Sequence, residues 1–231
     1  MKTLTFGIPS KGRLMEQAAE TLSAAGFDIE RNGTDRGYRG MLKGIEGVEV
    51  VFLSAGEIAQ NLRDGKIDFG ITGEDLLREK SSPADEHVIV LAALDFGFAN
   101  VVVAVPECWL DVASMADLDE VSESFYAAHG RRLRVATKYL NLTRRFFAEK
   151  GVTGYRIVES LGATEGAPAA GTAEIIVDIT TTGSTLAANN LKILDDGIIL
   201  KSSAVVGVSQ SALTDPRANV FHDCFKKQHS R

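Results

Sequence analysis

The chain has 231 residues, 45% hydrophobic and 24% charged, which fits a globular protein of one large domain or two smaller lobes. With 25 Lys and Arg against 31 Asp and Glu, the formal net charge of -6 excludes a general positive field for nucleic acid or anionic membrane, so an anionic substrate needs local positive groups. The start of the chain has no apolar signal-peptide core, and no later run approaches the roughly 18 apolar residues of a membrane helix, so we expect a cytoplasmic protein with neither membrane nor nucleic acid as partner.

Hydrophobic spacing predicts alternating strands and helices in the first part of the chain. Leu14, Ala18 and Leu22 follow helical spacing until Gly26 ends the helix. The predicted elements are a strand over residues 3–9, that helix, a hairpin of strands 40–43 and 48–53, a helix ending at 65 and a strand over 67–71. Such alternation is typical of an α/β fold with a largely parallel sheet.

The alternation continues after a polar connector over residues 81–86. The expected elements are strands 88–94, 101–105 and 133–137, a helix over 143–150, strands 155–161 and 174–179, a helix from Thr185, strands 191–194 and 198–200, and a last helix with Val220, Phe221, Cys224 and Phe225 on one face. We expect one α/β lobe, residues 1–97 and 195–231, to be interrupted by a second, residues 98–194, that carries the loop described next.

Cysteine content predicts neither a disulfide framework nor a metal site. Cys108 and Cys224 are only two, and His222 with Cys224 lacks the further ligands that complete a zinc site. We therefore expect both to be packed thiols and expect no metal site built by the protein alone.

A hydroxyl-rich turn between a strand and a helix is the most informative segment. A phosphate monoester needs several converging N–H and O–H donors, which a glycine-containing turn before a helix supplies. Asp178, at the carboxyl end of the strand, is placed to accept hydrogen bonds from sugar hydroxyls. An ordinary helix N-cap explains the short motif equally well. The residues of the turn are Thr180, Thr181, Thr182, Gly183, Ser184 and Thr185.

The whole segment over residues 165–186 resembles the signature of the ATP phosphoribosyltransferase family. The matching positions are Glu165, Gly171, Ala173, Ile176, Asp178, Ile179, Thr182, Gly183, Thr185 and Leu186. Residues 10–13, 68–75 and 134–139 extend the resemblance over nearly the full chain. It implies a two-lobed architecture similar to periplasmic binding proteins, with the active site in the cleft between the lobes.

The activity that this resemblance implies is the first step of histidine biosynthesis. Phosphoribosyl pyrophosphate donates its phosphoribosyl group to N1 of ATP, and pyrophosphate leaves. Mg²⁺ takes part, held mainly by the pyrophosphate oxygens of the substrate.

Site residues are carried over from the family by position. The resemblance implies that Glu165, Asp178 and the turn over residues 180–185 bind the phosphoribosyl donor. An exposed loop carboxylate explains Glu165 equally well. The resemblance implies that Lys11, Gly12 and Arg13 border the nucleotide site. The alternative interpretation is that these residues form a solvated basic turn without a ligand. A second turn of the ATP site contains Gly73, Glu74 and Asp75. Capping of the following helix explains the carboxylates of Glu74 and Asp75 equally well.

One departure from the family pattern concerns the leaving group. Many members carry an arginine where this sequence has Ser54, which cannot stabilise departing pyrophosphate by charge. Arg36 and Arg39, close upstream, are the catalytic residues that we expect to supply that charge, with solvated arginines as the alternative.

The chain resembles the short form of the family, which works with a regulatory subunit similar to histidyl-tRNA synthetase. We expect a homo-oligomer, most simply a dimer, within a larger hetero-oligomer. Two other functions stay open. One is another phosphoribosyltransferase, because the donor loop says little about the acceptor base, and the other is a non-catalytic two-lobed solute-binding protein.

Overall fold

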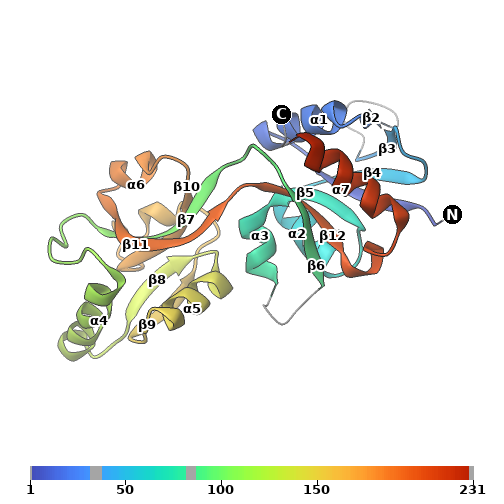
Figure 1. Ribbon diagram of the computed structural model, residues 1–231. Coiled ribbons are helices and arrows are strands. Elements are labelled where there is room, and N and C mark those ends of the chain that lie inside the picture. The colour runs from blue at the N-terminus through green and yellow to red at the C-terminus, as the bar shows by residue number, and fades with distance from the viewer. Residues whose placement is uncertain (1, 32–37, 82–86, 229–231) are drawn as a thin grey trace. The chain divides into compact units, whose positions relative to one another are not determined.

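The chain folds into two α/β units in the computed structural model, which describes residues 2–31, 38–81 and 87–228 (Figure 1). The first unit ends at Phe98 and resumes at Ser203, and the second takes Ala99–Ser202. The return to the first unit, expected at residue 195, comes eight residues later. The reason is that residues 198–202 remain paired with a strand of the second unit, as far as Ser202 opposite Ala99.

The first unit has a seven-stranded sheet in the order β2-β3-β4-β1-β5-β12-β6. Only β1 with β4 and β1 with β5 are parallel, so the sheet is mixed rather than largely parallel. The predicted hairpin is confirmed as β3 and β4. The bounds are β1 Leu4–Pro9, β2 Asp28–Arg31, β3 Arg39–Lys43, β4 Val48–Leu53, β5 Phe69–Gly73, β6 Val88–Ala93 and β12 Ala204–Ser209.

Helices cover both faces of this sheet (Figure 1). Side chains alternate along β1, so Leu4, Phe6 and Ile8 share one buried cluster with α1 (Arg13–Ala24) and α7 (Pro216–Gln228). The opposite cluster contains Ile58 and is formed chiefly by α2 (Ala55–Arg63) and α3 (Glu74–Lys80).

Three glycines lie side by side under α2. Gly70 of β5 is in register with Gly7 of β1 and with Gly207 of β12. A Cβ atom at Gly70 would come within 2.6 Å of Ile58 Cγ2, and one at Gly207 within 2.9 Å of Leu62 Cδ1. The absence of side chains at these positions lets α2 pack directly on the sheet.

The second unit has a five-stranded sheet in the order β11-β7-β10-β8-β9. β8 is parallel to both β9 and β10, whereas β7 runs antiparallel to β10 and β11. The strands are β7 Ala99–Pro106, β8 Leu133–Thr137, β9 Tyr155–Glu159, β10 Ile175–Thr180 and β11 Leu191–Ser202; the helices are α4 Met115–His129, α5 Leu140–Glu149 and α6 Ser184–Ala188, with short 3-10 turns at Thr164–Gly166 and, in the first unit, Gln210–Ala212.

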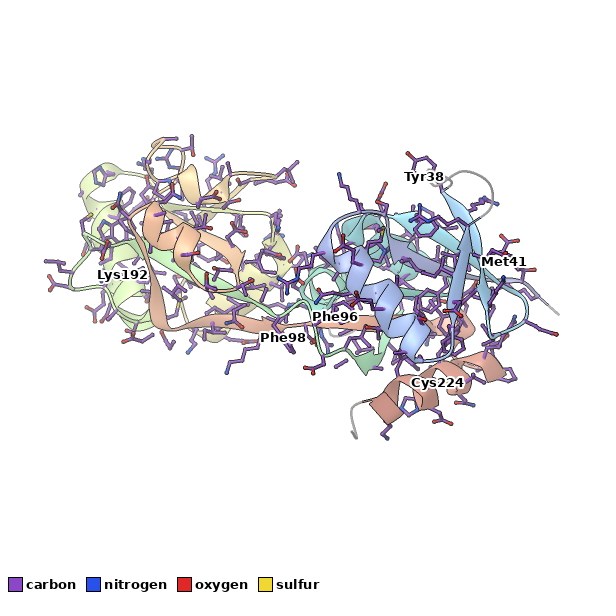
Figure 2. All side chains as sticks on the ribbon, turned by 90° about the horizontal axis from the view of Figure 1, so that it is seen from above. Tyr38, Met41, Phe96, Phe98, Lys192 and Cys224 are labelled. Atoms are coloured by element: carbon purple, nitrogen blue, oxygen red, sulfur yellow. The ribbon has the colours of Figure 1, made fainter. Side chains whose placement is uncertain are left out.

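Several details differ from the sequence-based expectation. The two strands predicted around residues 195–197 form one strand, β11, with a register shift between Ile193 and Ile198. Val220, expected on the buried face of the last helix, is 43% exposed, whereas Phe221 and Phe225 are buried. Cys108 is exposed rather than packed, and Cys224 on α7 is partly buried (Figure 2). Among the helices described, none has the length and apolarity required to cross a bilayer.

Candidate functional site

A cavity of about 370 Å³ opens at the carboxyl end of β10 in the second unit. It contains seven of the eight residues that the sequence assigned to the phosphoribosyl donor, the eighth being Gly183 within the same turn. Parallel strands β8 and β10 both end on this side, which is where open α/β sheets bind ligands. The lining residues are Ala99, Glu165, Asp178, Ile179, Thr180, Thr181, Thr182, Ser184, Thr185 and Leu186.

The turn after β10 is held by its own hydroxyl groups. Gly183, with φ of 76°, donates its N–H to Thr180 Oγ1 at 2.8 Å, and Thr182 Oγ1 lies 2.9 Å from Ser184 Oγ. A positive φ favours glycine, which explains this residue at the start of α6. The hydroxyls of Thr181, Thr182, Ser184 and Thr185 belong to exposed residues, so the turn presents several donors to the cavity.

Two carboxylates line the cavity beside this turn. Burial raises the pKa of Asp178 above its usual value, against the opposing influence of the Ile179 N–H and the Lys138 ammonium, and negative Glu165 raises it further. Asp178 Oδ1 accepts the N–H of Ile179 at 2.8 Å. Both carboxylates are only partly buried, so they remain able to accept hydrogen bonds from hydroxyl groups of a ligand.

Of the three other lining residues, Ile179 and Leu186 belong to the predicted loop without being named as donor-binding residues, and only Ala99 lies outside the predicted segments. Ile179 and Leu186 flank the polar turn, and their apolar side chains belong to the same signature segment. Ala99 reaches the cavity because β7 pairs with β10, with Asn100 opposite Thr180. That pairing joins residues 80 positions apart and has no local sequence signal.

The residues predicted for ATP lie at the carboxyl ends of β1 and β5, two neighbouring parallel strands in the middle of the first sheet. Lys11, Gly12 and Arg13 follow β1 and are exposed, whereas Gly73 ends β5, which is parallel to β1. Glu74 accepts two hydrogen bonds from Arg78, at 3.1 and 3.2 Å, and Asp75 is buried beside Gly73. Both acidic residues thus belong to the first turn of α3, where carboxylates also favour the helix dipole.

Of the two arginines proposed to stabilise the leaving group, the structure describes only one. Arg36 lies outside the described residues. Arg39 is exposed at the start of β3, opposite Val51 near the end of β4. Ser54 begins α2, where it accepts the N–H of Glu57 at 3.3 Å and donates its own to the Glu57 carboxylate at 2.8 Å. A serine at this position therefore caps a helix.

The described side chains include no group of three or more His, Cys, Asp or Glu arranged to hold a metal ion. Glu165 and Asp178 nevertheless line one cavity, and carboxylate oxygens are ligands that suit Mg²⁺. Mg²⁺ commonly uses one or two carboxylates together with substrate phosphates and water. The cavity therefore fits an ion that arrives with a phosphorylated substrate.

Sequence comparison connects this geometry to known proteins. The profile of the ATP phosphoribosyltransferase family matches residues 54–226. A protein named ATP phosphoribosyltransferase from Rhodopseudomonas palustris (strain HaA2) is 60% identical over 207 residues, which are 90% of this chain and 64% of that protein. A protein of the same name from Mesorhizobium japonicum is 58% identical over 212 residues, 91% of each chain. The chain thus spans about two thirds of the length of some relatives and most of another.

Comparison with solved structures finds a member of the same family and proteins that share only the fold. A chain from the "ATP phosphoribosyl transferase (HisG:HisZ) complex from Thermotoga maritima" is similar with a TM-score of 0.72 and 27% identity, over 98% of this chain and all of the other. A putative L-cystine ABC transporter from Listeria monocytogenes has a TM-score of 0.58 at 14% identity, over 98% and 90% of the two chains. The second likeness shows a shared fold alone and carries no functional argument.

Proposed function

Because the chain belongs to the ATP phosphoribosyltransferase family, we propose that it transfers the phosphoribosyl group of phosphoribosyl pyrophosphate to N1 of ATP, releasing pyrophosphate in the first step of histidine biosynthesis. The observation that carries this proposal is the cavity at the carboxyl end of β10, where a turn of hydroxyl donors lies beside two carboxylates. Hydroxyl and amide donors suit the 5-phosphate, and carboxylates suit the ribose hydroxyls. We also propose a cytoplasmic location for the chain, in keeping with a reaction that consumes ATP.

The proposed chemistry requires positioning rather than a covalent intermediate. The turn over residues 180–185 binds the 5-phosphate, and Asp178 with Glu165 orients the ribose through its hydroxyls. Lys11, Gly12, Arg13 and the turn Gly73–Asp75 bind ATP. Holding N1 of adenine in line with the anomeric carbon replaces a bimolecular encounter with a preorganised one.

Charge on the leaving group must also be stabilised. We assign this role to Arg36 or Arg39 in the first unit. Mg²⁺, bound with the substrate, supplies further neutralisation of the pyrophosphate, and Glu165 and Asp178 are the residues that would hold it.

The test of this function is an acceptor assay. Purified protein is incubated with phosphoribosyl pyrophosphate, Mg²⁺ and one of ATP, AMP, adenine or another base, and products are resolved by mass. Phosphoribosyl-ATP formed in preference to every other product supports the proposal. Transfer only to another base favours a different phosphoribosyltransferase, and binding without any transfer favours a solute-binding protein.

We further propose that the chain forms a dimer that works with a regulatory subunit similar to histidyl-tRNA synthetase. The support is the likeness to the Thermotoga maritima chain, whose structure is described as a complex of two components. Histidine is expected to bind the assembly and not the isolated chain, because coupling between sites requires a shared equilibrium. Titrating histidine into the chain alone, and then into the reconstituted complex, tests this; saturable inhibition of the chain alone contradicts it.

A further inference from the structure

The cavity of the second unit has an imbalance of charge. Among the described residues that line it are two carboxylates, Glu165 and Asp178, and no basic side chain. Phosphoribosyl pyrophosphate carries several negative charges on its two ends. Hydroxyl groups and amides solvate a phosphate but do not neutralise it, so a cation next to this lining has a large effect on donor binding.

Lys138 lies beside the cavity at the end of the neighbouring strand. β8 and β10 are parallel, with Ile176 opposite Ala136, so continuing this register by two residues brings Lys138 level with Asp178. Lys138 is exposed, and its positive charge opposes the rise that burial causes in the pKa of Asp178.

The backbone next to Lys138 is fixed by buried contacts. Tyr139 is 1% exposed and donates its N–H to Thr137 Oγ1 at 2.8 Å. The Lys138 ammonium lies 5.0 Å from the centroid of the Tyr139 ring, within the range of a cation–π contact. Lys138 is therefore the first residue after β8, held between the end of that strand and the buried Tyr139.

The hydroxyl-rich turn and Lys138 approach Asp178 from different strands, because the turn continues β10 itself whereas Lys138 follows the neighbouring strand β8. In the sheet, β10 lies between β7 and β8, and α6 leads into β11 on the β7 side. A donor with its 5-phosphate at the turn and its ribose at Asp178 therefore directs its other end toward β8. That end carries the pyrophosphate on the anomeric carbon.

We propose that Lys138, in addition to Arg36 or Arg39, binds the pyrophosphate of the donor and stabilises the charge that this group gains as it leaves. The inference rests on the proposed function, which identifies the donor. In the transfer, the bond between the anomeric carbon and pyrophosphate oxygen breaks with its electron pair passing to pyrophosphate. The lone pair of adenine N1 forms the new bond to carbon, and the exocyclic amino group of adenine releases a proton to solvent.

The test compares two ligands that resemble the two ends of the donor. Calorimetry with pyrophosphate and with ribose 5-phosphate is carried out, with Mg²⁺ present, on the wild type, Lys138→Met and Lys138→Arg. Removing a charged hydrogen bond weakens binding by about 10- to 100-fold, so Lys138→Met is expected to lose that much affinity for pyrophosphate and little for ribose 5-phosphate. Lys138→Arg is expected to recover part of the loss because it keeps the charge.

The control is Arg132→Met, which removes one positive charge from an exposed residue just before the other end of β8. Unchanged pyrophosphate affinity in Lys138→Met overturns the inference, as does an equal loss for both ligands or an equal loss in the control. Single-turnover rates with ATP give the second readout, and a slower chemical step in Lys138→Met supports the role in leaving-group departure. If the wild type binds pyrophosphate through Lys138 but forms no phosphoribosyl-ATP, the binding site stands and the proposed function fails.

Discussion

Replacing Glu174 by glutamine is expected to weaken the second unit at neutral pH and to have much less effect in acid. Glu174 immediately precedes β10 and pairs with two arginines, since Arg134 Nη2 lies 2.6 Å and Arg131 Nη2 2.9 Å from its Oε1. Its carboxylate also accepts the backbone N–H of Arg134 at 2.8 Å. One side chain thus connects the start of β10 to the adjacent strand β8, at the end of β10 opposite the cavity.

The pKa of Glu174 gives the size of this effect. Burial opposes ionisation, but hydrogen bonds from Arg134 and Arg131 outweigh it and lower the pKa from 4.5 to about 2. A pKa lower in the folded chain stabilises the fold fully above pH 4.5, and this stabilisation is lost as the pH falls through 2. The pKa difference corresponds to about 3 kcal/mol, which solvent screening around the 46% exposed Arg131 side chain reduces to about 1–2 kcal/mol.

Urea unfolding followed by the fluorescence of Trp109 measures this contribution, because Trp109 is the single tryptophan and lies in the second unit. Glu174→Gln should lower the free energy of unfolding at pH 7 by about 1–2 kcal/mol, and the difference from wild type should fall by more than half at pH 3. The control is Glu123→Gln, on an exposed position of α4. A difference that is equal at both pH values, or shared by the control, would refute the electrostatic explanation.

Three further predictions concern packing and the site. Gly70→Ala should lower the free energy of unfolding by about 1–3 kcal/mol because its Cβ meets Ile58 Cγ2 at 2.6 Å, whereas Gly56→Ala, with no neighbouring atom within 4 Å, should not; urea unfolding followed by circular dichroism compares them. Asp178→Asn should lower kcat by at least about tenfold while raising stability at pH 7, because burial raises the pKa of Asp178 and makes its ionised form costly; a loss of both would contradict the assignment. Valine at both Thr182 and Thr185 should weaken ribose 5-phosphate binding by about 1–3 kcal/mol per lost hydrogen bond, and unchanged calorimetric affinity would remove these residues from the phosphate site.

Local sequence determined the elements whose signals lie within one segment. β8 begins and ends at Leu133 and Thr137 as predicted, because its apolar run is bounded by polar residues. The turn at Gly183 follows in the same way from a glycine among hydroxyl residues, so the hydroxyl-lined part of the cavity was predictable. The capping box of Ser114 and Asp117 is a comparable local signal for the start of α4.

Tertiary structure decided the features that depend on residues distant in the sequence. β2 has no fully buried side chain, two of its four residues being exposed. It becomes a strand because Ile29 and its neighbours pair with β3, an edge pairing that local pattern does not indicate. The pairing of Glu174 with Arg134, the row of glycines under α2 and the position of Lys138 level with Asp178 likewise arise from strand order and register. Sequence periodicity determines which face of a strand is buried, but the choice of neighbouring strand depends on how the whole hydrophobic surface is covered.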